Sequence, residues 1–330
     1  MEFWSVEIIC FGTRIKTPFS GCLGPPAARI RGRRVPREDR SAWAMKVTEY
    51  RIPMPMCTEQ YLRGHLYSQI KYEGEESTGK GDGVLVLDSK KWEEIDKETG
   101  EAVEKGWYTR KKMFLKKKVP GYVRLLLPSA ALVLEEESFS DTTGSHLKTK
   151  TVYKNLYFTS FRLTVETFVA DDDMGQQHDP IGLDEERLRK RKIKVLDICD
   201  DSSLKKEDRK AEEDPTLVRW EGAEIGPLER GKWWTERESE NKPNMWIYKN
   251  VCSEVPYAML RGTLEEFITN SAMLNVLLKL NRKIYCLGDE WMHLTSEALR
   301  SKEKDENAKK EETLSKDIPG SDEDAEISAS

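Results

Sequence analysis

The 330-residue sequence lacks several features that mark particular classes of protein. It has no run of roughly 18 to 20 apolar residues, the length that a membrane-spanning helix needs. Its six cysteines are too widely spaced for a C-x-x-C motif, and its four histidines never recur four residues apart, so no zinc site is predicted. A G-x-S-x-G nucleophile motif is also missing. We therefore expect neither a membrane span nor a metal or other cofactor, and we expect a binding protein, not an enzyme.

A strong net charge is absent as well. The chain carries 54 basic and 59 acidic side chains and a formal net charge of −5, so no overall basic field draws it to nucleic acid. Widely spaced cysteines in a long chain are typical of free thiols, which predicts a reducing, cytoplasmic setting. Charged residues themselves are abundant, at 34% of the chain, as in proteins with a solvated rim or disordered ends.

The two ends differ in charge from the middle. Residues 1–44 carry eight basic and four acidic side chains, a net of +4, whereas residues 301–330 carry five and ten, a net of −5. We interpret 1–44 as an unstructured basic extension, with a targeting segment or ordered structure as alternatives. Residues 301–330 are predicted to form an acidic tail that is disordered from about residue 305 onward. Residues 45–305 are therefore expected to fold alone.

The middle of the chain alternates between strand-like and helix-like patterns. Val47–Ile52 alternates with the period of two that suits a half-buried strand, and Thr58 can cap a following amphipathic helix. A long helix is predicted for 263–287, and a second short helix after Thr295. Further strands are predicted near 83–88, 107–115, 131–139, 147–156, 160–169 and 193–199. Short polar turns between strands and a long helix at the end indicate an α+β fold with a mostly antiparallel sheet.

Two motifs allow more than one interpretation. The glycines of Gly79–Gly83 suggest a phosphate loop and hence a nucleotide-binding enzyme or hydrolase, but a strand follows them where a helix is required, which favours a hairpin. The basic run Arg187–Lys192 could bind anionic lipid or act as a nuclear signal. Acidic residues precede it at pairing distance along a helix, which favours a solvated helix face.

Seven segments of the sequence resemble the phosphatidylinositol transfer proteins, a family of START-like lipid carriers. They are Glu49–Pro55, Glu59–Tyr67, Lys105–Lys111, Lys118–Pro120, Lys210–Pro215, Gly226–Leu228 and Asp289–Thr295. Lys210–Pro215 is the most specific, and the resemblance spans about residues 46–300. It implies a lipid-binding domain over 45–300, in which a curved, mostly antiparallel sheet grips long helices around a deep apolar cavity.

The resemblance also implies a set of headgroup-binding residues. The family's inositol contacts match Thr109, Lys111 and Glu136, and Ser140 stands in place of an asparagine. On the phosphate side, Thr167 matches, and a second threonine is either Thr149 or Thr151. His65 replaces a glutamine. Glu254 aligns with a phosphate-binding lysine, which would reverse the charge there.

Membrane docking is implied for the loop after Glu254, where Tyr257 and Ala258 replace the family's paired tryptophans and Met259 follows. We therefore expect a monomeric carrier of phosphatidylinositol or phosphatidylcholine that exchanges its lipid between membranes. It would reside in the cytoplasm and touch membrane surfaces transiently. The alternative is a lipid-sensing or lipid-presenting module whose headgroup preference is altered by Glu254.

Overall fold

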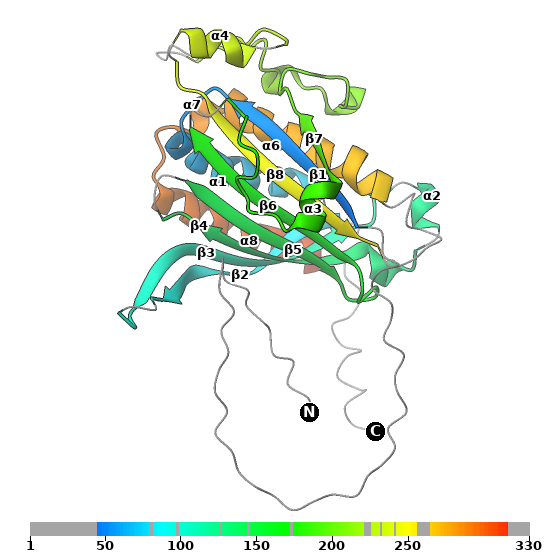
Figure 1. The fold of residues 1–330 in the computed structure, drawn as a ribbon. Helices are drawn as coiled ribbons and strands as arrows, with labels where there is room; N and C mark the ends of the chain where they lie inside the picture. Colours follow the sequence, from blue (N-terminus) through cyan, green and yellow to red (C-terminus); the bar gives the residue numbers. More distant parts are fainter. Residues whose placement is uncertain are drawn as a thin grey trace, which may run out of the picture. The chain divides into compact units, whose positions relative to one another are not determined.

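The computed structural model describes residues 45–315 except 79–81, 97–98, 120, 126, 144–145, 172–173, 221–225, 232, 241 and 256–264. The basic extension at 1–44 and the end of the tail at 316–330 therefore lie outside the described residues. The fold is α+β, as predicted, with one large sheet and helices laid against it (Figure 1).

Eight strands form one sheet in the order β2-β3-β4-β5-β6-β8-β1-β7. All neighbours are antiparallel except β1 and β7, which are parallel. The strands are β1 (Lys46–Met54), β2 (Asp82–Ile95), β3 (Ala102–Leu115), β4 (Val133–Asp141), β5 (Leu147–Asn155), β6 (Arg162–Asp171), β7 (Arg191–Val195) and β8 (Met245–Glu254).

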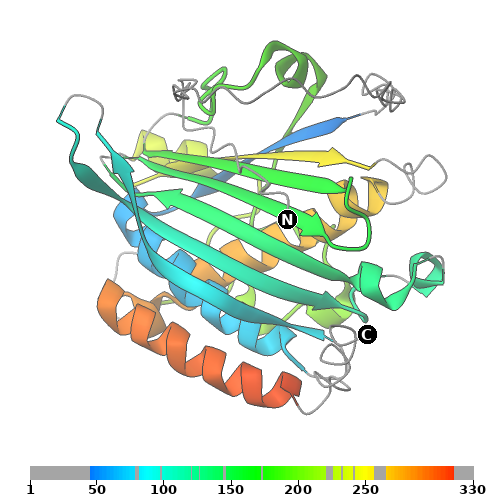
Figure 2. The same cartoon turned by 90° about the horizontal axis from the view of Figure 1, so that it is seen from below.

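Three long helices lie on one face of this sheet, which we call the inner face (Figure 2). They are α1 (Thr58–Glu76), α6 (Met273–Cys286), which continues a π-helical turn η5 (Ile268–Ala272), and α8 (Ser296–Ser315). The short helices are α2 (Gly121–Arg124), α3 (Glu185–Lys190), α4 (Trp233–Ser239), α7 (Gly288–Trp291), η2 (Ser129–Leu132), η3 (Lys206–Asp208) and η4 (Ala211–Glu213). Among the described residues, no helix combines the length and apolar character needed to cross a membrane.

The main hydrophobic core lies between the inner face and the helices. Tyr50, Ile52 and Val251 from central strands meet Leu277 and Ile284 from α6 in this cluster, all of them almost fully buried. The approach of α1 to α7 depends on a missing side chain. A Cβ at Gly64 would stand 2.7 Å from the buried ring of Trp291, closer than real contacts allow. Glycine at this position therefore lets the two helices touch.

The prediction of a disordered tail from about residue 305 was wrong for the residues that the structure describes. Helix α8 runs to Ser315, and its inner side buries Leu299, Lys310 and Leu314. Asn307 pairs with the backbone of the edge strand β2, accepting from the Val86 N–H at 2.8 Å and donating to the Val86 carbonyl at 3.1 Å. The average composition of 301–330 concealed this face, because three buried positions of α8 suffice to dock a helix that is otherwise charged.

Strand β8 was absent from the strands predicted by periodicity, although it lies near the centre of the sheet. Eight of its ten residues are buried. A strand that is covered on both faces shows no alternation between apolar and polar residues, so a period-two search does not find it. This omission matters because β8 carries one of the main polar side chains of the interior.

The basic run at 187–192 is largely paired with carboxylates, as the helix-face interpretation predicted. Arg187 contacts Asp184 at 2.7 Å and Glu166 at 2.5 Å, and Lys190 contacts Glu186 at 2.7 Å. Arg191 reaches the buried Glu49 at 2.7 Å. The run therefore links α3 to β6 and β7 to β1 through ion pairs.

Candidate functional site

The inner face carries polar side chains in a region where a sheet packed on helices is usually apolar. Because side chains alternate along a strand, Thr109 and Lys111 of β3 point to the same face. Lys111 lies opposite Glu136 of β4, and Ser140 of β4 lies opposite Trp107. The ammonium of Lys111 reaches α1, which shows that this face is the inner one.

The same register continues across the sheet to β8. Ser140 is opposite Thr149, Thr149 is opposite Thr167, and Thr167 is opposite Lys249. Of the two threonines named as alternatives, Thr149 belongs to this row. Thr151 belongs to the next row, where its hydroxyl lies 2.9 Å from that of Ser138.

Lys249 was not among the predicted site residues, and Glu254 was chosen in its place. The two lie five positions apart on β8 and therefore face opposite sides of the sheet. Glu254 is opposite Arg162 at the end of β6 and points away from the helices, whereas Lys249 is the cation beside Thr167. The inner face therefore has no reversed charge at this point. The sequence signal that could have identified Lys249 was a lone lysine within the apolar run of β8.

Lys249 is only weakly compensated by opposite charge. Its side chain keeps some exposed surface, yet desolvation lowers its pKa to about 8, and Glu136 is the one carboxylate among the described residues that opposes this shift. The hydroxyl of Thr167 beside it has no hydrogen-bond partner in the part of the chain that the structure describes, although Thr167 is only 6% exposed. An unpaired buried hydroxyl next to an under-compensated ammonium is costly unless a ligand satisfies both.

His65 of α1 faces this group of charges from the helix side. Burial, followed by the positive charges of Lys249, Lys111 and Arg300, lowers its pKa to about 3. The imidazole is therefore neutral at physiological pH, with one nitrogen that can donate a hydrogen bond and one that can accept.

Lys111 is held by a buried triad that includes both α1 and α8. Its ammonium donates to Glu73 at 2.5 Å, and Lys310 donates to the other oxygen of Glu73 at 3.1 Å. The two ammonium groups outweigh desolvation and lower the pKa of Glu73. Burial has the opposite effect on Glu136, whose pKa it raises, and the hydroxyl of Tyr153 donates to that carboxylate. We call Glu73, Lys111, Glu136, Lys249 and Lys310, with Thr167, the inner polar cluster.

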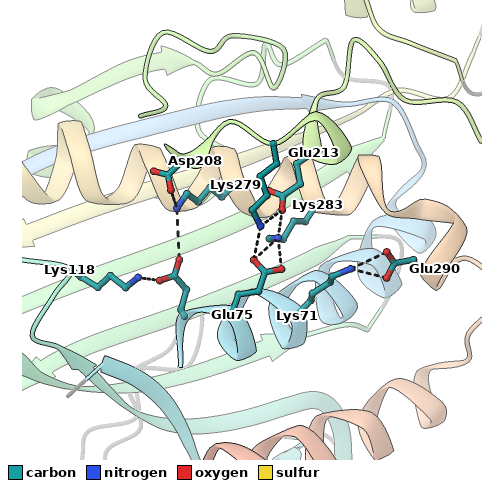
Figure 3. Close-up of polar contacts among 10 residues, drawn as sticks. Lys71, Glu75, Lys118, Asp208, Glu213, Lys279, Lys283 and Glu290 are labelled. Carbon is teal, nitrogen blue, oxygen red and sulfur yellow. Dashed lines mark hydrogen bonds and ion pairs between the residues drawn. The ribbon is translucent and has the colours of Figure 1, made fainter. Parts of the chain in front are cut away.

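A second ion cluster lies between α1, α6 and η4, and it contains the most specific motif of the sequence (Figure 3). Lys283 of α6 contacts Glu75 at 2.8 Å and Glu213 at 2.5 Å, and Lys210 contacts the same two carboxylates at 3.3 and 3.0 Å. Each charge in this helix cluster meets opposite charges. In this structure, Lys210–Pro215 therefore joins α1 and α6 through ion pairs.

The docking residues Tyr257, Ala258 and Met259 fall outside the described residues. Residues 79–81 of the glycine segment are also outside them, and β2 begins within that segment, at Asp82. Within the described part of the chain, no three His, Cys, Asp or Glu side chains gather as a metal site. Cys57, Cys199, Cys252 and Cys286 are free thiols.

Comparison with known proteins agrees with this architecture. A family model described as phosphatidylinositol transfer protein matches residues 45–308. The chain is 33% identical over 280 residues to phosphatidylinositol transfer protein 1 of Dictyostelium discoideum, covering 84% of this chain and 98% of that protein. It is 31% identical over 273 residues to the beta isoform of phosphatidylinositol transfer protein of Bos taurus, covering 82% and 94%. With membrane-associated phosphatidylinositol transfer protein 1 of Mus musculus it shares 32% identity over 261 residues, 79% of this chain but 20% of that protein.

A curved sheet that packs long helices on one face, with a hydrophobic core and a polar cluster between them, places the chain in the START-like class of lipid-binding folds. Within that class, the chain belongs to the phosphatidylinositol transfer protein family. The family match ends at residue 308, so it includes the first two thirds of α8.

Proposed function

We propose that this chain binds one phosphatidylinositol molecule between the inner face and the helices and carries it between membranes. The observation that carries the proposal is the position of Lys249 on β8, directly beside the unbonded hydroxyl of Thr167 on β6. A phosphodiester has one negative charge and oxygens that accept hydrogen bonds, so it would satisfy both groups at once. No covalent chemistry is part of the proposal.

The inositol ring would lie toward β3 and β4. Ring hydroxyls both donate and accept, so they suit a site that offers an ammonium, a carboxylate and hydroxyls together. Lys111, Glu136, Thr109 and Ser140 provide these groups on neighbouring strands. His65, kept neutral by its surroundings, adds a donor or an acceptor from the helix side.

The acyl chains need an apolar interior of their own. Exposing a chain to water costs about 0.8 kcal/mol per CH₂ group, so a carrier must replace the bilayer along the full length of the chain. The core between the sheet and α6 is built from large apolar side chains, many of them fully buried. Lys249 and His65 are partly exposed yet strongly desolvated, which supports an enclosed space beside them.

Phosphatidylcholine is a second cargo in this proposal, because its phosphodiester would occupy the same place beside Lys249. We propose further that the chain acts as a cytoplasmic monomer and touches membranes through Tyr257, Ala258 and Met259. Replacing Tyr257 by alanine should slow lipid transfer between vesicles and leave the bound lipid in place, because aromatic side chains favour the membrane interface. Unchanged transfer would place docking elsewhere.

The alternative of a sensing module with altered headgroup preference rested on Glu254. That carboxylate points away from the inner face, and Lys249 supplies a cation there, so a carrier with ordinary phosphate contacts is the better-supported function.

Lys249→Met tests the proposal against Glu254→Gln as a matched control on the same strand. Both proteins would be incubated with phosphatidylcholine vesicles containing phosphatidylinositol, repurified, and their bound lipid measured by mass spectrometry. We expect at least a tenfold loss of captured phosphatidylinositol for Lys249→Met and little change for Glu254→Gln. Normal capture by a folded Lys249→Met protein would refute the assigned phosphate site.

A further inference from the structure

The triad of Lys111, Glu73 and Lys310 has a feature that ring binding alone does not require. Lys111 is only 2% exposed, and its ammonium is already held at 2.5 Å by the carboxylate of Glu73. Glu136 approaches the same ammonium from the neighbouring strand. Lys111 therefore interacts with two carboxylates, one on the sheet and one on α1.

The charges at this end of the inner polar cluster are balanced. Lys111 and Lys310 bring two positive charges, and Glu73 and Glu136 bring two carboxylates. Arg300 and Glu303 of α8 lie nearby and pair with each other at 2.9 Å, so they add no net charge. The other end differs, because Lys249 has a hydroxyl beside it and no carboxylate within ion-pair distance among the described residues.

We propose that Glu73 is a specificity-determining residue that restricts the site to headgroups with a single phosphate. The inference rests on the proposed function, since it assumes that the inositol ring lies beside Lys111. A hydroxylated, uncharged ring fits an electrically balanced end. A phosphate ester on the ring would bring about 1.5 to 2 further negative charges there, next to Glu73 and Glu136.

Repulsion is strong at such a place because the surroundings are poor in water. Two like charges a few ångströms apart repel far more strongly in a partly desolvated site than in bulk water. Glu73 also keeps Lys111 and Lys310 occupied, so neither ammonium is left to attract a second phosphate. Removing the Glu73 charge should therefore raise the share of ring-phosphorylated lipid that the protein selects.

The test compares lipid selection by four proteins, each in the full chain. Each would be incubated with phosphatidylcholine vesicles containing equal amounts of phosphatidylinositol and phosphatidylinositol 4-phosphate, repurified, and analysed by mass spectrometry. The wild type should capture phosphatidylinositol in preference. Glu73→Gln, which preserves shape and removes one charge, should shift the capture ratio toward the 4-phosphate by about tenfold or more.

The two remaining variants separate charge from stability. Glu75→Gln breaks a similar buried ion pair two residues along α1, but in the helix cluster, so it should lower stability and leave the capture ratio unchanged. The double variant Glu73→Gln with Lys310→Met restores the charge balance, and its ratio should return toward that of the wild type. If Glu73→Gln alone fails to fold, Lys310→Met is added as a fifth protein, and the double variant should show a higher 4-phosphate share than Lys310→Met by a similar factor.

The inference is overturned if a folded Glu73→Gln protein captures phosphatidylinositol with an unchanged ratio. It is equally overturned if Glu75→Gln shifts the ratio as much, or if the wild type captures both lipids alike. Each of these outcomes leaves the proposed function intact. A wild-type protein that captures neither inositol lipid would instead refute the proposed function, and this inference with it.

Discussion

Glu73 and Glu75 lie two residues apart on α1 and belong to two ion clusters of different character. Glu75 joins Lys283, Glu213 and Lys210 in the helix cluster, where every charge meets opposite charges (Figure 3). Glu73 joins the inner polar cluster, which ends in the under-compensated Lys249 and an unpaired hydroxyl. The difference suggests that complete pairing marks a structural cluster, whereas incomplete pairing in the interior marks a place for a ligand.

The largest effect is expected from breaking the helix cluster. Lys283→Met would leave Glu213 buried without its closest partner, and removing one member of a buried ion pair typically costs about 3 to 5 kcal/mol. We expect a loss of stability of that order, measured by urea unfolding, with headgroup selection unchanged in the folded fraction. A change in lipid selection would show that the two clusters are not separate.

A smaller loss is expected from shortening α8. Ending the chain at Asp305 removes Asn307, Lys310 and Leu314, which dock the helix on β2 and Glu73. We expect a loss of about 2 to 4 kcal/mol relative to a chain ending at Ser315, since it removes a buried leucine and a buried ion-pair partner. Equal stability of the two truncated chains in urea unfolding would show that the second half of α8 does not support the core.

The sequence allowed most of the fold to be predicted, because seven strands and two long helices carry clear periodicity. The predicted cap of α1 was wrong by one residue, since Cys57 is the N-cap and Thr58 is the first helical residue. The prediction failed at β8 and α8 for opposite reasons. β8 is buried on both faces and so shows no alternation. α8 is so highly charged that the average composition of the segment hid its narrow buried face.

The candidate site was likewise predicted only in part. Thr109 and Lys111 share a face of the sheet as predicted, and the register places Glu136, Ser140 and Thr167 on that face too. The roles of these residues as lipid contacts remain predictions.

Lys249, Glu73 and Lys310 could not be found in the same way. The position of Lys249 depends on the register between β6 and β8, and the triad depends on where α8 docks. Both depend on tertiary structure. A lone lysine in an apolar strand and a glutamate near the end of a helix carry no local signal of their partners.

An effect of about tenfold is expected at Lys111. Lys111→Ala should reduce phosphatidylinositol transfer by roughly that factor, since a charged hydrogen bond to the ring contributes about 1.5 to 3 kcal/mol. Phosphatidylcholine has no ring hydroxyls, so its transfer should change little. The two lipids would be followed in parallel vesicle assays. An equal fall for both lipids would mean that Lys111 supports the structure and does not select the headgroup.

The smallest effect concerns pH and depends on the charge of Lys249. With a pKa of about 8 in the folded protein, Lys249 is charged at pH 7 and mostly neutral at pH 9. His65 stays neutral over this range, and Glu136 is the carboxylate that faces Lys249. We therefore expect phosphatidylinositol capture by lipid-free protein to fall severalfold between pH 7 and pH 9.

The free energy of unfolding should rise with pH over a neighbouring pH range, whereas lipid capture falls. In the unfolded chain this lysine has a pKa near 10.4, so between about pH 8 and pH 10 the unfolded state holds a proton that the folded state has released. The contribution of Lys249 to the free energy of unfolding therefore rises with pH in that window. Lys249→Met should remove both trends, which urea unfolding and lipid capture can measure on the same samples. If the variant keeps the wild-type pH dependence of capture, the titrating group lies elsewhere, and the ammonium of Lys249 is not what holds the phosphate.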